Sequence, residues 1–304
     1  MTVEIRDRRF ADVVGPALEF ECLADGLEFT EGPVWDAARR RLIFSDIPAA
    51  RIYEWSEAGG LKVFRDPSHK ANGLALDREG RLLACEHATS RVTRLEADGR
   101  ITVIADRHGG VELNSPNDIV VSSGGRIYFT DPSYGRMDYY GVAREEALGY
   151  RGVYRVDPHG GAPVLLADDF AQPNGLCFSR DERRLYVNDT ERMHIRAFDV
   201  RDDGSLAGGA VWAEVSGTGD GAPDGMKIDR DGHVYCCGPG GIHVFDHDAR
   251  CLGVILVPTP VANFAWGDDD RRSLYMTASG SLWRARVRTP GHLAGVEAPA
   301  TVRS

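Results

Sequence analysis

The chain has 304 residues, of which 42% are hydrophobic and 27% charged, a composition typical of a globular protein with a full core. Its 36 Lys and Arg against 46 Asp and Glu give a formal net charge of −10. This balance disfavours nucleic acid as a partner, because phosphate contacts need a basic surface. No stretch approaches the ~18 uninterrupted apolar residues of a membrane span, so no membrane association is expected.

The start of the chain and the cysteines indicate the compartment. The first ten residues lack the apolar segment of a secretory signal, so we expect a cytoplasmic protein. The six cysteines show no Cys-x-x-Cys spacing, and several lie in apolar runs such as Val234-Tyr-Cys-Cys237. We therefore expect buried free thiols rather than disulfides or a zinc–thiolate site.

A repeated segment organises the chain. Each copy opens with a short polar residue, followed in most copies by Gly, then by an apolar strand and a hairpin. The copies begin at Glu31, Asn72, Asn117, Asn174 and Asp224, with a degraded sixth copy at Asn263. The intervals of 41, 45, 57, 50 and 39 residues match the period of a β-propeller blade. The sequence therefore predicts an all-β, six-bladed propeller with four antiparallel strands in each blade.

The second and last repeats show how the blades are built. In the second repeat, strands are predicted over 73–77, 81–85, 91–95 and 100–104, joined by short turns and a loop. The last repeat supplies only three strands, over 262–266, 273–277 and 281–287. We expect residues 18–23 to complete that blade, because such closure hides the sheet edges and ties the termini together. Residues 1–304 then form a single domain.

A propeller brings the start of every innermost strand to one mouth of a central channel. The loops after the second strands face the same mouth and carry Asp46, His87, Asp131 and Asp189. Without a cation, the carboxylates gathered there with the amides would repel one another and carry a desolvation cost. The oxygen-rich set suits Ca²⁺, Mg²⁺ or Mn²⁺ first, with Zn²⁺ or Fe²⁺ possible.

Several of these residues have a simpler interpretation than cation or substrate binding. Asn-Gly pairs also make turns, so Asn72 and Asn263 could merely connect blades. Glu31 precedes Gly-Pro and serves no turn chemistry, which favours a functional role. His87 is either a substrate contact or a solvated surface residue. The longest insertion, residues 132–150, leaves from the same mouth, and we expect either a lid or a plain excursion.

Five motifs, in order along the chain, identify a family resemblance. They are Glu31-Gly-Pro-Val-Trp, Asn114-Ser-Pro-Asn-Asp118, Phe129-Thr-Asp-Pro-Ser-Tyr-Gly135, Gln172-Pro-Asn-Gly175 and Pro223-Asp-Gly225. Over about residues 17–288 the chain resembles the gluconolactonase, regucalcin (senescence marker protein) and luciferin-regenerating enzyme family, and most closely its bacterial gluconolactonase branch. The resemblance implies a six-bladed propeller with one divalent cation, which hydrolyses sugar lactones.

The resemblance also implies roles for individual residues. The metal ligands fall on Glu31, Asn174 and Asp224, and Asp224 matches the carboxylate expected to act as general base. Asn117 matches a substrate contact that could also reach the metal. Animal members place Arg two residues before that Asn, where this chain has Ser115, so other residues would contact the sugar hydroxyls. The expected substrate contacts are Ser115, Asn117, His87, Asp131, Tyr134 and Arg136.

Two other functions fit the same fold. One is phosphotriester hydrolysis at the same metal. The other is a non-enzymatic calcium-binding propeller, which is disfavoured because Asp224 is a potential catalytic base. A serine hydrolase route is disfavoured because the chain has no Gly-x-Ser-x-Gly elbow. We expect a sugar lactone as the small-molecule partner and a monomer or weak homo-oligomer.

Overall fold

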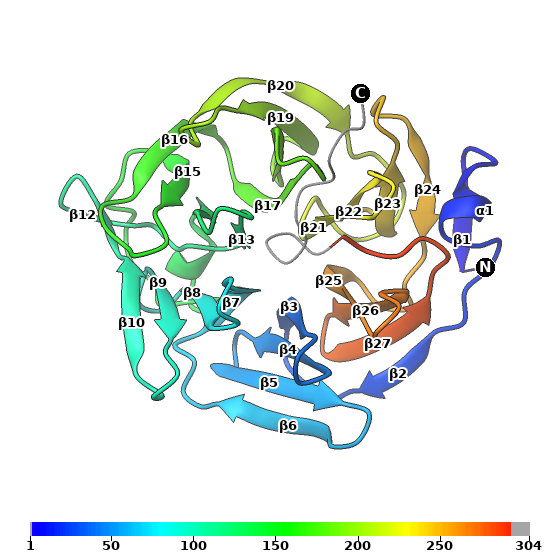
Figure 1. The fold of residues 1–304 in the computed structure, drawn as a ribbon, viewed down its shortest axis with the longest axis horizontal. Coiled ribbons are helices and arrows are strands. Elements are labelled where there is room, and N and C mark those ends of the chain that lie inside the picture. The colour runs from blue at the N-terminus through cyan, green and yellow to red at the C-terminus, as the bar shows by residue number, and fades with distance from the viewer. Residues whose placement is uncertain (1, 293–304) are drawn as a thin grey trace.

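The computed structural model of the chain describes residues 2–292. Six antiparallel sheets are arranged as blades around one channel (Figure 1). The prediction of an all-β, six-bladed propeller is confirmed. No helix within residues 2–292 is long and apolar enough to cross a membrane.

Blades one to four are four-stranded. Blade one contains β3 (Thr30–Asp36), β4 (Arg41–Asp46), β5 (Arg51–Ser56) and β6 (Gly60–Arg65), and blade two contains β7 (Ala71–Leu76), β8 (Leu82–Glu86), β9 (Arg91–Leu95) and β10 (Ile101–Ala105). A small hairpin of β11 (Arg107–His108) and β12 (Val111–Glu112) follows. Blade three contains β13 (Ile119–Val121), β14 (Ile127–Asp131), β15 (Arg151–Val156) and β16 (Val164–Phe170), with the short 3₁₀ helix η1 (Tyr134–Arg136) between β14 and β15. Blade four contains β17 (Pro173–Phe178), β18 (Arg184–Asp189), β19 (His194–Val200) and β20 (Leu206–Glu214).

The last two blades each receive a strand from the N-terminus. Blade five contains β21 (Met226–Ile228), β22 (Val234–Gly238), β23 (Gly241–Phe245) and β24 (Cys251–Ile255), with β1 (Val3–Ile5) as a fifth, outermost strand. Blade six contains β25 (Val261–Gly267), β26 (Ser273–Ala278) and β27 (Ser281–Arg286), and β2 (Glu21–Ala24) completes it. The short helix α1 (Phe10–Val13) lies between β1 and β2 in the chain.

The predicted closure by residues 18–23 is confirmed, but the strand lies slightly later. Glu21 pairs with Arg284 and Cys22 with Trp283, whereas Leu18 packs in the apolar core shared by blades five and six. The addition of β1 to blade five was not predicted. Three residues are too few to show an alternating pattern in the sequence, so only the pairing with β24 reveals this strand.

The polar residue that opens the repeat lies inside the innermost strand in blades one, two, four and six, and just before it in blades three and five. In the first four of these blades the strand pairing shifts register close to that residue, as between Glu31 and Val34 in blade one. Such an irregularity re-aims a side chain out of the regular alternation. Asn72 and Asn263 therefore lie in β7 and β25, and the interpretation of them as turns between blades is wrong.

The glycines of the repeats allow neighbouring innermost strands to approach closely. A Cβ on Gly175 would lie 2.1 Å from the Asp224 carbonyl oxygen, and one on Gly73 would lie 2.4 Å from that of Asn117. Any larger residue would push the blades apart. The six innermost strands therefore contact one another in ring order, and the residues that open the repeats converge.

Removal of residues 1–24 should abolish cooperative unfolding, because it removes β2 from the last blade and the buried Phe10 from the core. Thermal unfolding followed by circular dichroism should show a broad transition at low temperature. Removal of residues 1–6 is the control: it takes away β1 alone and should preserve a cooperative transition. Wild-type unfolding behaviour of the longer truncation would show that closure by β2 is not required.

Candidate active site

A cavity of about 140 Å³ opens at the mouth where the repeats begin. It is lined by Phe29, Glu31, Ile47, Asn72, His87, Asn117, Tyr134, Tyr140, Asn174, Thr190 and Asp224. Six of the residues predicted from the sequence are therefore brought together: Glu31, His87, Asn117, Tyr134, Asn174 and Asp224.

Two carboxyl groups meet in this cavity. Glu31 is buried and Asp224 is half-buried, and the Asp224 carboxyl interacts with the side chains of Glu31 and Asn174. Burial in the channel raises the pKa of Glu31 to about 7, and the nearby Asp118 charge adds to this. Burial, followed by the charges of Glu31 and Asp118, raises the pKa of Asp224 well above its ordinary value. The pair therefore resists carrying two negative charges without a cation.

A third acidic residue, Asp118, adds to the negative charge in the channel. Asp118 is buried; its Oδ1 accepts a hydrogen bond from the Ile119 N–H, and its Oδ2 has no hydrogen-bond partner among the described residues. Burial raises the pKa of Asp118, and the Lys227 ammonium opposes that rise. Lys227 Nζ donates to Asn263 Oδ1 at 3.2 Å. The Lys227 ammonium thus acts on Asp118 and Glu31.

The donor atoms fit a hard divalent cation. Within residues 2–292 no three His, Cys, Asp or Glu side chains are grouped to hold a metal alone, so amide oxygens must contribute. Asn174 Nδ2 donates to Thr190 Oγ1 at 3.1 Å, which leaves Asn174 Oδ1 for a cation. Asn263 Nδ2 donates to Glu31 Oε2 at 3.0 Å, which leaves Glu31 Oε1 available. Carboxylate and amide oxygens are the ligands that Ca²⁺ prefers.

His87 is a neutral hydrogen-bond acceptor in the cavity wall. Its Nδ1 lies 3.0 Å from the Tyr140 carbonyl oxygen, so Nδ1 carries the hydrogen and Nε2 the lone pair, 3.4 Å from Asn72 Nδ2. Burial, together with the Lys70 charge, lowers the pKa of His87 to about 4. The side chain is 1% exposed, so the alternative of a solvated surface residue is wrong.

The insertion 132–150 forms one wall of the cavity. It is an irregular excursion with one short 3₁₀ turn, η1, and it contributes Tyr134 and Tyr140 to the lining. Lys70 Nζ donates to the carbonyl oxygens of Asp138 at 2.7 Å and Tyr139 at 3.1 Å, which ties the insertion to blade two. The Tyr140 ring meets Phe29 edge-on, with centroids 5.3 Å apart.

Three predicted substrate contacts do not line the cavity. Arg136 Nε donates to the Asn114 carbonyl oxygen at 2.7 Å, and its guanidinium pairs with Glu112 at 3.0 Å. Ser115 Oγ donates to the Pro132 carbonyl oxygen and accepts from the Gly135 N–H. Asp131 accepts from the backbone N–H groups of Asn114 and Ser115. Backbone groups already occupy the polar atoms of these side chains. The side chains therefore lie behind the cavity wall, where they hold the insertion and the segment that leads into β13.

Other lining residues were missed from the sequence. Phe29, Ile47 and Thr190 flank motif residues in the chain, and attention to those neighbours could have found them. Tyr140 lies in the insertion, which has no repeat period, so nothing in the sequence distinguishes it from Tyr139. Its inward position depends on the way the insertion folds.

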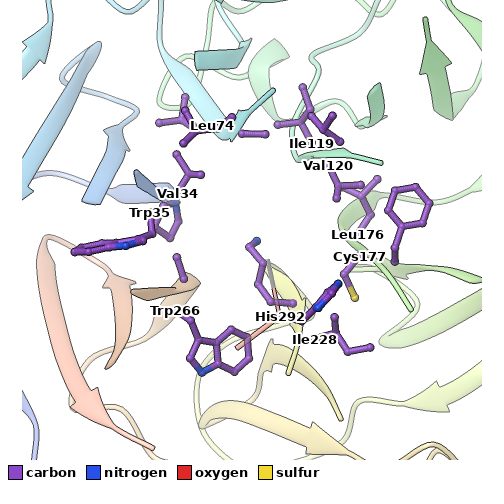
Figure 2. Close-up of a pocket in the computed structure, with 17 residues that line it drawn as sticks. Val34, Trp35, Leu74, Ile119, Val120, Leu176, Cys177, Ile228, Trp266 and His292 are labelled. Atoms are coloured by element: carbon purple, nitrogen blue, oxygen red, sulfur yellow. The ribbon is translucent and has the colours of Figure 1, made fainter. Parts of the chain in front are cut away.

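A second cavity lies farther along the channel, where the innermost strands continue away from the carboxylates. It measures about 130 Å³, and Figure 2 shows Val34, Leu74, Ile119, Leu176 and Trp266 around it. The residues that line it include no carboxylate or side-chain amide. Of these two cavities, the first therefore has the oxygen ligands that a hard cation requires.

The fold and the acidic, amide-lined mouth define a propeller suited to a bound cation and a small polar ligand. Residues 29–280 match the model of the SMP-30/gluconolactonase/LRE-like region, and the chain belongs to that family. The gluconolactonase of Zymomonas mobilis is 30% identical over 306 residues, which cover 93% of this chain and 85% of the relative. The pentonolactonase of Haloferax volcanii is 30% identical over 258 residues, 82% of this chain and 81% of the relative.

Comparison with solved structures gives a consistent result. The gluconolactonase of Xanthomonas campestris matches with a TM-score of 0.88 and 36% identity, covering 94% of this chain and 95% of that one. The calcium-binding protein regucalcin of Agrobacterium tumefaciens matches with a TM-score of 0.77 over 92% of this chain and 97% of that one. At 20% identity the second match supports the fold alone. The family resemblance predicted from the five motifs is confirmed.

Metal-free protein should lose stability as the pH rises from about 5 to about 8. The folded-state pKa of Glu31, about 7, lies above the ordinary value, so its proton stabilises the folded state at low pH. That contribution is lost as the pH rises through the folded-state pKa. After exhaustive chelation, the melting temperature should fall over this range, and saturating Ca²⁺ should restore it at the upper end.

Glu31→Gln is the matched control for this titration. The variant lacks the ionisable group, so its metal-free melting temperature should depend less on pH and should recover less on addition of Ca²⁺. A pH-independent melting temperature of chelated wild-type protein would contradict the electrostatic account of the cavity.

Proposed function

We propose that this protein is a divalent-cation-dependent lactonase that hydrolyses neutral sugar lactones in the Glu31–Asp224 cavity. The observation that carries the proposal is the convergence of Glu31, Asn174 and Asp224 on one cavity. This convergence gathers carboxylate and amide oxygens at one point of the channel mouth. The named relatives above support the same reaction, because they are a gluconolactonase and a pentonolactonase.

Different groups of the cavity contribute to successive steps of the reaction. Glu31, Asn174 and Asp224 would hold the divalent cation, which would supply a Lewis acid for the lactone carbonyl. Asp224 faces the cavity and takes the proton from the attacking water. The bond between the carbonyl carbon and the ring oxygen then breaks, and the ring oxygen takes a proton. The product is the open-chain hydroxy acid. The all-oxygen donor set favours Ca²⁺.

The remaining wall suits the hydroxyl groups of a sugar. Asn72 and Asn117 offer amides, and His87 Nε2 offers a lone pair because its Nδ1–H is engaged by Tyr140. The rings of Phe29 and Tyr140 offer an apolar surface to one face of a sugar ring. A cavity of about 140 Å³ matches one ring rather than an oligosaccharide.

The charge of the cavity selects against anionic substrates. None of the described lining residues is Lys or Arg, whereas Glu31 and Asp224 are acidic. A phosphate or sulfonate on the sugar would find no cationic partner in the wall. We therefore assign the substrate class as neutral aldonolactones. No specific contact favours phosphotriesters, and the acid–base arrangement disfavours a purely calcium-storing role.

Asp224→Asn should lower lactonase activity by about 10²–10⁴, the usual contribution of a general base. The amide keeps the size of the side chain and one oxygen, so some cation binding should remain. Activity is measured by the pH drop on an aldonolactone, after subtraction of spontaneous hydrolysis, and cation content by metal analysis. Glu31→Gln, by comparison, should lose activity in proportion to lost cation and recover part of it at high cation concentration. Cation-replete Asp224→Asn protein with near wild-type turnover would rule out Asp224 as the base.

Neutral lactones should be hydrolysed at least about 100-fold more efficiently than their phosphorylated counterparts. The described lining residues include no Lys or Arg to pair with a phosphate, and an unpaired buried charge costs several kcal/mol. The comparison uses kcat/KM for gluconolactone and 6-phosphogluconolactone under matched conditions. Equal efficiency for both would contradict the assigned substrate class.

A further inference from the structure

Three aspartates hold the chain at the mouth in one repeated arrangement. Asp46, Asp131 and Asp189 end the second strands of blades one, three and four. Each is at most 1% exposed. Each carboxylate accepts hydrogen bonds from two consecutive backbone N–H groups, at distances between 2.7 and 3.1 Å.

The donors occupy the same positions relative to the cavity in all three blades. They are the third and second residues before the side chain that opens the repeat. The pairs are Glu28 and Phe29 before Glu31, Asn114 and Ser115 before Asn117, and Ala171 and Gln172 before Asn174. The same offset in three independent blades indicates a geometric requirement rather than a local accident.

The carboxylates replace backbone partners that the strands cannot supply. The register shift just after Glu31 and around Asn174 interrupts the regular ladder where the chain enters the cavity. Hydrogen bonds to an ionised acceptor are stronger than those between neutral groups. Two such bonds to consecutive N–H groups fix both the position and the direction of that backbone segment. Each aspartate thus fixes the short segment that carries a cavity side chain.

The remaining blades do not use this arrangement. At the equivalent position blade two has Glu86, which pairs with Arg65 and Arg91 instead. Blade five has Gly238 there and blade six has Ala278. Asp224 is held differently, because its carbonyl oxygen accepts from Asn188 Nδ2 at 2.6 Å. A propeller blade can therefore form without the aspartate. Where the aspartate is present, the backbone N–H groups that it binds precede an expected cation ligand or substrate contact.

We propose that Asp46, Asp131 and Asp189 are positioning residues that set the places of Glu31, Asn117 and Asn174 around the bound cation and the lactone. The proposal rests on the proposed function. Asp46 and Asp189 act through cation ligands and so govern cation affinity. Asp131 acts through Asn117 and so governs the KM for the lactone.

The test replaces each aspartate by asparagine, which retains only one acceptor oxygen for the two N–H donors. Calorimetric titration of the chelated full-length protein with Ca²⁺ should show about 10–100-fold weaker binding for Asp46→Asn and Asp189→Asn, the usual effect of losing a group that orients a ligand. Asp131→Asn should raise the KM several-fold, with a smaller change in Ca²⁺ affinity.

Asp246→Asn is the matched control. Asp246 is also buried and accepts from two backbone N–H groups, those of Asp248 and Arg250, but it lies in a hairpin of blade five outside the cavity lining. The control should lower the melting temperature comparably and leave Ca²⁺ affinity unchanged. If Asp189→Asn does not fold, Asp46→Asn and the milder Asp189→Glu variant decide the question.

Two outcomes separate the hypotheses. Folded Asp46 and Asp189 variants that bind Ca²⁺ as tightly as wild-type protein would overturn the positioning role while leaving the lactonase proposal intact. Wild-type protein that binds no divalent cation would instead refute the proposed function, and the positioning role with it.

Discussion

The close approach of the six innermost strands is the constraint on which the rest of the structure depends. Gly73, Gly175 and Gly225 leave no room for a side chain between one innermost strand and the next; a Cβ on Gly225 would lie 2.2 Å from the Asn263 side chain. Because the strands are this close, residues far apart in the sequence share one small cavity. Glu31 and Asn263, at opposite ends of the chain, are hydrogen bonded.

That convergence has an electrostatic cost. Glu31, Asp118 and Asp224 share one channel, and burial raises the pKa of each. Lys227 offsets only part of the negative charge, and its ammonium donates a hydrogen bond to Asn263 Oδ1. A divalent cation offsets the rest, so the arrangement that costs stability in the metal-free protein is the one that creates the binding site.

Residues behind the cavity determine how its side chains are presented. Thr190 Oγ1 donates to the Pro223 carbonyl oxygen and accepts from the Asn174 amide, so it links blades four and five and also orients an expected ligand. His87 is similarly oriented by a carbonyl of the insertion. The cavity is therefore held from several blades at once, which suits a site that must hold oxygen ligands at fixed distances.

The sequence by itself determined the blade count, the closure of the ring and the convergence of Glu31 and Asp224, because the repeat period encodes where each innermost strand begins. It did not determine the partners of Asp131 and Arg136, which lie next to motif residues yet bond to backbone groups behind the wall. It also did not distinguish Tyr140 from its neighbours. These features depend on which polar atoms meet after the blades pack, and contacts between distant segments leave no period in the chain. Tertiary structure therefore decided which of the residues next to the repeat openings line the cavity and which only support it.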